Sequence, residues 1–80
     1  MEPEQELVTG KTRILRELAA SLHDMAQPLT ALQCRLEIGQ MFGTPASYEE
    51  AVLEALRESQ RLFTAVTSMR EILRQALEQN

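Results

Sequence analysis

The stretch LHDMAQPL at residues 22–29 decides the fold predicted for this 80-residue chain, because it lies within a long leucine repeat and contains the only histidine. A histidine and a glutamine four residues apart share one face of a helix, so His23 and Gln27 are expected to lie side by side. Asp24 follows the histidine directly. Pro28 cannot donate a backbone hydrogen bond to the carbonyl of Asp24, which predicts a bend in the helix just after His23.

Apolar residues on both sides of this stretch recur at alternating spacings of three and four, the a/d heptad pattern of a helix in a bundle or a coiled coil. The residues of this first repeat are Leu15, Leu18, Leu22, Met25, Leu29, Leu32 and Leu36. The repeat keeps its phase across Pro28, so we predict one bent helix over about residues 11–40. Gly10 interrupts the preceding helical sequence, and residues 1–10 are expected to form a linker or a frayed helix start.

Glycines and a proline over residues 39–45 end the first repeat and predict a loop at about residues 41–46. Ser47, with Glu50 three residues later, matches a capping box, in which a hydroxyl and a carboxylate satisfy free backbone N–H groups at a helix start. A second helix is therefore expected over about residues 47–78. Its apolar repeat runs through Val52, Ala55, Ser59, Leu62, Val66, Met69, Leu73 and Ala76.

Two long helices joined by a short loop pack as antiparallel neighbours. The predicted fold class is thus all-α, with one antiparallel two-helix hairpin over residues 11–80. Each helix has an apolar face too wide for the other helix to cover, and the remainder needs burial. Two hairpins that pair about a twofold axis close a four-helix bundle, because the same surface serves both subunits. We therefore predict a homodimer.

Composition and charge exclude several classes of partner. The net charge of -4 argues against nucleic acid, whose binding needs clustered Lys and Arg. The least charged run, residues 18–34, contains a histidine, an aspartate and two glutamines, so neither a membrane span nor direct membrane contact is expected. Cys34 is the single cysteine and fits a reducing, cytoplasmic compartment. One histidine and one cysteine eleven residues apart provide too few ligands for a metal site.

The surface around His23 is expected to be open and poor in charge. His23 and Gln27 fall at heptad positions b and f, and Asp24 is the only charged residue between Glu17 and Arg35. Small uncharged residues on the same face would leave room for a docking partner; they are Ala20, Thr30 and Cys34. A neutral imidazole is a nucleophile, and an adjacent carboxylate can accept its proton. An exposed histidine on a rigid helix suits phosphoryl transfer, which depends mainly on positioning.

Residues 23–29, preceded by Ala-Ser-Leu and followed by Thr-Ala-Leu, resemble the H-box of the dimerisation and histidine-phosphotransfer domain of bacterial sensor histidine kinases. The resemblance covers most of the chain: a helix with the H-box, a loop and a second helix. It implies that His23 is the autophosphorylated histidine, that Asp24 is the general base and that Pro28 bends the helix. Many members carry Thr or Asn four residues after the histidine, to place the water that attacks in dephosphorylation; this chain carries Gln27.

The resemblance also implies partners. ATP and Mg would bind a separate catalytic domain, because residues 70–80 hold none of the glycine-rich boxes of that domain, and no cofactor is expected in this chain. The chain would be the phosphoacceptor part of a protein-histidine kinase and inactive alone. It would pass its phosphoryl group to an aspartate in the receiver domain of a response regulator. We interpret the sequence as an excised kinase domain or a stand-alone phosphoacceptor, cytoplasmic or forming the cytoplasmic part of a membrane-bound sensor.

Two alternatives remain open on the sequence. The first is a purely structural dimerisation module in which His23 is inert. The second is a monomeric phosphotransfer protein, which would usually need four helices within one chain.

Overall fold

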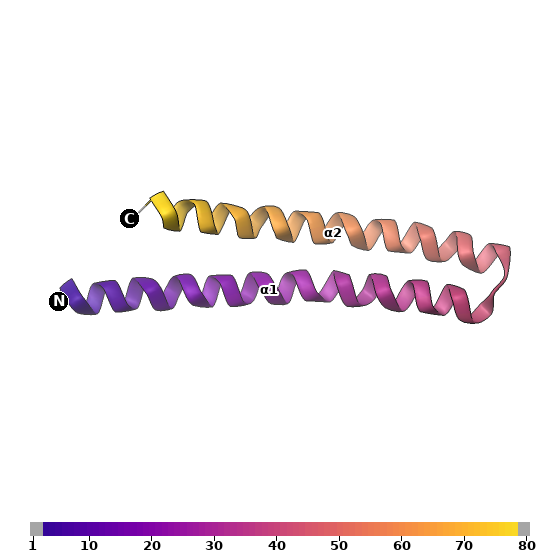
Figure 1. Cartoon of the computed structure of the whole chain (residues 1–80), viewed down its shortest axis with the longest axis horizontal. Helices are drawn as coiled ribbons and strands as arrows, with labels where there is room; N and C mark the ends of the chain where they lie inside the picture. Colours follow the sequence, from indigo (N-terminus) through magenta and orange to yellow (C-terminus); the bar gives the residue numbers. More distant parts are fainter. Residues whose placement is uncertain (1–2, 79–80) are drawn as a thin grey trace.

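The computed structural model describes residues 3–78, which form two helices, α1 (Pro3–Phe42) and α2 (Pro45–Glu78). The helices lie side by side and antiparallel (Figure 1), and the hairpin measures 64 × 18 × 11 Å. The predicted all-α antiparallel hairpin is therefore confirmed. Residues 1–2, which belong to the predicted linker, and residues 79–80, which end the predicted hairpin, lie outside the described residues.

The first helix is longer than the prediction of residues 11–40 and continues through Gly10 without a break. One glycine inside a helix costs only about 1 kcal/mol, which its helix-forming neighbours tolerate. α1 is also continuous through Pro28 (Figure 1), so it is one helix and not two, whereas the bend at this proline stays a prediction. The helix is terminated by the next residue, Gly43, where φ is +66° and the N–H donates to the carbonyl of Gly39 at 3.0 Å. A glycine in this left-handed conformation is a common helix terminator.

The capping box of α2 is formed by Thr44 and Ser47. The backbone N–H of Ser47 donates to Thr44 Oγ1 at 3.1 Å, and the backbone N–H of Thr44 donates to Ser47 Oγ at 3.0 Å. Pro45 is the first helical residue, where the N–H that it lacks would have had no helical partner. The capping box predicted from Ser47 to Glu50 is therefore wrong by three residues, because Pro45 starts the helix and does not belong to the loop.

The face of α1 that packs against α2 is displaced from the predicted repeat. Leu18, Met25 and Leu32 are half-buried, as the repeat predicts. The four leucines of the other heptad position are instead 44–65% exposed; they are Leu15, Leu22, Leu29 and Leu36. The positions that complete the contact stripe are mostly small or compact: Ile14, Ser21, Pro28 and Gly39. Small residues let two helix axes approach closely, so α2 packs on this stripe and leaves the larger leucines beside it.

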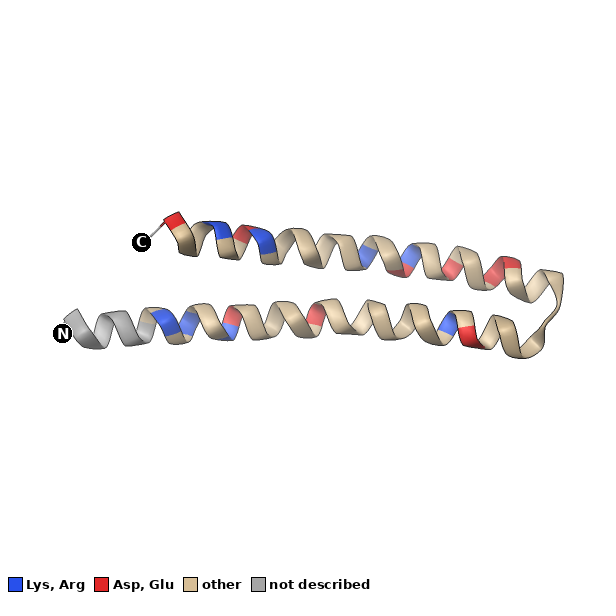
Figure 2. Ribbon diagram, in the orientation of Figure 1, with Lys and Arg blue, Asp and Glu red and all other residues tan. Residues whose placement is uncertain are grey.

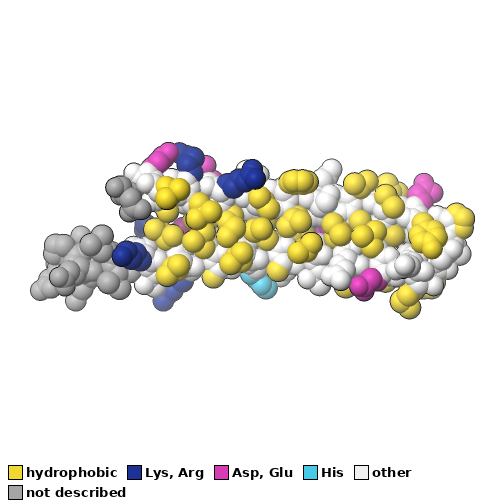
Figure 3. All heavy atoms as spheres, in the orientation of Figure 1, with side chains coloured by type: hydrophobic (Ala, Val, Ile, Leu, Met, Phe, Trp, Pro, Cys, Tyr) yellow, Lys and Arg dark blue, Asp and Glu magenta, His cyan; other side chains and the backbone are white. Residues whose placement is uncertain are grey.

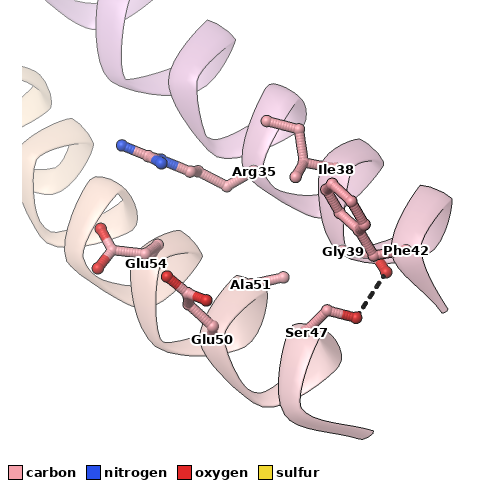
Figure 4. Close-up of a pocket in the computed structure, with 8 residues that line it drawn as sticks. All are labelled: Arg35, Ile38, Gly39, Phe42, Ser47, Glu50, Ala51 and Glu54. Atoms are coloured by element: carbon pink, nitrogen blue, oxygen red, sulfur yellow. Dashed lines mark hydrogen bonds between the residues drawn. The ribbon is translucent and has the colours of Figure 1, made fainter. Parts of the chain in front are cut away.

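The helices approach each other closely near the loop, where Gly39 faces Ala51 (Figure 4). A Cβ atom added to Gly39 would collide with the Cβ of Ala51 and would come within 3.2 Å of the carbonyl oxygen of Ser47. The hydroxyl of Ser47 also lies 3.3 Å from the carbonyl oxygen of Gly39. This contact fixes which residues of α1 and α2 lie opposite each other along the hairpin.

One side of the hairpin is a continuous apolar surface, which we name the apolar face (Figure 3). Its large side chains are 42–73% exposed: Leu15, Leu22, Leu29, Leu36, Tyr48, Val52, Phe63, Leu73 and Leu77. The chain exposes 6601 Å². A compact monomer of 9.1 kDa exposes only about 4,900 Å². The elongated hairpin therefore exposes more surface than a compact chain of its mass, and the apolar face is part of that surface.

Ion pairs within α2 follow its helical spacing. Arg57 pairs with Glu54 at 2.8 Å, three residues away. Arg74 contacts Glu71 and Glu78 near the end of the helix, and its hydrogen bond to Glu71 holds the pKa of that carboxyl below its ordinary value. The middle of α1, by contrast, carries few charged residues (Figure 2).

Replacement of Gly39 by Ala should destabilise the hairpin, although alanine is the better helix former. The gain in helix propensity is about 1 kcal/mol, whereas overpacking against Ala51 and the Ser47 carbonyl costs about 1–3 kcal/mol. We expect a net loss of about 1 kcal/mol in the free energy of unfolding, measured by urea denaturation.

Gly10→Ala is the matched control, because an added Cβ at Gly10 meets no atom within 4 Å. That variant should be as stable as the original chain or up to about 1 kcal/mol more stable. If Gly39→Ala also stabilised the chain, the close approach of the helices at this position would be wrong.

Candidate functional site

The side chains of His23 and Gln27 lie together on the outward surface of α1, as their spacing predicts. Both residues are exposed, and His23 Nε2 lies 3.0 Å from Gln27 Nε2. The two side chains are one helical turn apart, so the contact follows from the helix itself. In Figure 3 the histidine lies at the edge of the hairpin, beside the apolar face and not within it.

The contact with Gln27 has a consequence for the tautomer of His23. An amide NH₂ group is a donor only, so this contact is a hydrogen bond in the tautomer whose Nε2 accepts. The neutral ring then carries its proton on Nδ1 and its lone pair on Nε2. A lone pair on an exposed ring nitrogen is the feature that a nucleophilic histidine requires.

Asp24 lies on the flank of α1 that borders α2. There it lines a shallow open cleft, which we name the polar cleft. The cleft is lined by Asp24, Gln27, Pro28 and Ala31 of α1 and by Glu58 and Arg61 of α2. Gln27 therefore lies between the two, because it contacts His23 and also lines the polar cleft.

Glu58 and Arg61 were missed by the sequence interpretation. Glu58 is only 8% exposed, and its Oε1 accepts a hydrogen bond from Arg61 Nη1 at 3.2 Å. Buried carboxylates are rare unless they are paired, so this pair marks a polar point in the helix contact. No spacing within one helix could predict that α2 brings these residues to the flank of Asp24.

The remaining predicted site residues fall into two groups. Pro28 is buried against α2, so its ring is part of the helix contact. Ala20, Thr30 and Cys34, predicted to receive a docking partner, are all exposed. By helical spacing they share the outward face of α1 with His23. Among residues 10–78, whose side chains the structure describes, no group of three His, Cys, Asp or Glu could hold a metal ion.

Over the described part of the chain, neither α1 nor α2 contains a stretch long and apolar enough to cross a bilayer. Comparisons of the sequence with protein-family models and with curated proteins, and of the chain with solved structures, found no match.

Replacement of Gln27 by Ala should change the tautomer balance of His23. Loss of the amide donor removes the contact that holds the ring proton on Nδ1, so the two neutral tautomers should become more equally populated. The ¹⁵N chemical shifts of the imidazole measure this balance directly, and the chain has a single histidine to assign.

Gln33→Ala is the control, because Gln33 makes the same type of contact with Glu37, four residues away. That variant should leave the imidazole shifts unchanged. Identical shifts in the Gln27→Ala variant and the original chain would contradict the contact between His23 and Gln27.

Proposed function

We propose that this chain is a phosphoacceptor and dimerisation domain of the kind found in two-component sensor histidine kinases, with His23 as the phosphorylated residue. The observation that supports the proposal most is the exposed imidazole of His23. The residue is exposed, its Nε2 contacts only the side chain of Gln27 among the hydrogen-bond partners found, and a carboxylate follows it on the same helix. The resemblance of residues 20–32 to the H-box points to the same residue independently of the geometry.

In the proposed reaction a separate catalytic domain presents ATP to His23. The Nε2 lone pair attacks the γ-phosphorus, a bond between nitrogen and phosphorus forms, and the bond from the γ-phosphorus to the bridging oxygen of ADP breaks. The ring proton leaves from Nδ1 to Asp24 or through it to water, which keeps the product ring neutral. The phosphoryl group then moves to a carboxylate of a receiver domain, and His23 regains its proton.

Dimerisation through the apolar face is the second part of the proposal. Stacking of two apolar faces would produce a four-helix bundle and cover the leucines that α2 does not reach. His23 lies at the margin of this face (Figure 3), so a second hairpin would leave the imidazole accessible. The low-charge surface with Ala20, Thr30 and Cys34 would remain open for a receiver domain.

A purely structural dimerisation module is the alternative function. The observation that favours it is the apolar face itself, which accounts for a helical hairpin without any chemistry at His23. The two functions differ in one outcome, the appearance of a covalent phosphoryl group on the histidine.

His23→Gln should abolish phosphorylation, because glutamine has no ring nitrogen to attack phosphorus. The measurement is acid-labile labelling of the chain by radioactive ATP in the presence of the catalytic domain of a histidine kinase. The melting temperature should hardly change, because His23 is exposed and makes no contact across the hairpin. Labelling that persists in His23→Gln would refute the proposed phosphorylation site.

Asp24→Asn tests the proposed base in the same assay. The amide cannot accept the ring proton, so labelling should slow by about 10²-fold or more while the helix content stays the same. Glu17→Gln serves as the control, because Glu17 is an exposed acid on the same helix, seven residues before Asp24. Equal rates for Asp24→Asn and the original chain would remove Asp24 from the mechanism.

Leu29→Glu should convert the proposed dimer to a monomer. Leu29 is 53% exposed at the centre of the apolar face, and a charge buried there by a second hairpin would have no partner. Leu53→Glu is the matched control, because Leu53 is also 53% exposed but points about 100° away from its neighbour Val52 on that face. Sedimentation equilibrium should show a monomer only for Leu29→Glu. A monomeric original chain would contradict the dimer directly.

A further inference from the structure

We infer that Arg61 of α2 binds the phosphoryl group that the proposed function places on His23, and that Glu58 positions its guanidinium group. The inference rests on the proposed function. It adds a residue of the second helix to a site that the sequence assigns entirely to the first. Arg61 carries the one cation that lines the polar cleft in the described part of the chain.

The charge around His23 creates the need for such a group. A phosphoryl group on Nε2 carries up to two negative charges near neutral pH, and Asp24 adds a third close by. α1 offers no cation between residues 17 and 35 to offset them. The cation must therefore come from another element, and α2 packs on the flank of α1 that carries Asp24.

The position of Gln27 connects His23 to the polar cleft. A group bonded to Nε2 must lie along the direction of the nitrogen lone pair, where the Gln27 amide now lies at 3.0 Å. The incoming phosphoryl group thus displaces this amide or lies against it. Gln27 also lines the polar cleft together with Arg61, so the side chain that the phosphoryl group would displace is itself a neighbour of that cation's cleft.

Glu58 holds Arg61 in a defined place. Its carboxylate is nearly buried between the helices and accepts one hydrogen bond from Arg61 Nη1 at 3.2 Å. The side chain of Arg61 is otherwise 73% exposed. A guanidinium group has five N–H donors in a planar fork that matches phosphate oxygens, so donors remain for an anion while one is anchored.

The test uses potassium phosphoramidate, a small phosphoryl donor that replaces both ATP and the catalytic domain. The Nε2–P bond forms, the P–N bond of the donor breaks, and the ring proton leaves with ammonia as ammonium. Phosphorylation of Arg61→Gln should be about tenfold slower than that of the original chain, because one charge-assisted hydrogen bond to the anion is lost. Arg61→Lys, which keeps the charge but loses the fork, should fall between them.

A second readout separates phosphoryl binding from a structural role. In a ³¹P NMR titration, a neighbouring cation favours the dianionic phosphoryl group and lowers its pKa. The pKa of the phosphorylated Arg61→Gln chain should therefore be higher than that of the phosphorylated original chain. Glu58→Gln should raise this pKa less than Arg61→Gln does, because it keeps the Arg61 cation and also removes a negative charge.

Arg57→Gln is the matched control, since Arg57 lies one turn away on α2, pairs with Glu54 and does not line the polar cleft. It should match the original chain in both rate and titration. Equal rates and equal titration curves for Arg61→Gln and Arg57→Gln would overturn the role of Arg61 while leaving the proposed phosphorylation of His23 intact. Failure of phosphoramidate to label His23 in the original chain would overturn both.

Discussion

The close contact of α1 with α2 through small residues determines the rest of the structure. Gly39 and Ala51 allow the two backbones to approach near the loop, and Ser21 and Pro28 continue the narrow stripe along α1. A contact that depended on large leucines would have buried them within one hairpin. Because the helices instead meet on small residues, the leucines of α1 remain on the surface, and the stability of a single hairpin is limited.

This arrangement separates two surfaces with different properties on either side of the helix contact. One side is the apolar face, whose large side chains stay exposed in the single hairpin. The opposite side is the polar cleft, where Asp24, Glu58 and Arg61 come together from both helices. His23 lies on the outward surface of α1, so the imidazole and the apolar face occupy different areas of the hairpin.

The sequence predicts the hairpin and the contact between His23 and Gln27 because both depend only on helical periodicity. The start of α2 was misplaced because Pro45 can end a loop or begin a helix, and residue type alone does not distinguish the two. The polar cleft was missed for a different reason. The relation of Arg61 to Asp24 depends on the register of one helix against the other, which the contact of Gly39 with Ala51 sets through space.

Pro28 belongs to the helix contact and also affects the backbone of α1 beside His23. Its ring is buried against α2 and so contributes to the contact that holds the hairpin together. The same residue cannot donate a hydrogen bond to the carbonyl of Asp24, which weakens the backbone of α1 within one turn of His23. α1 thus packs against α2 at the same residue that leaves the carbonyl of Asp24 without its helical hydrogen bond. Glu58 and Arg61 of α2 line the polar cleft beside this proline, so the helix contact, the backbone next to His23 and the polar cleft meet at Pro28.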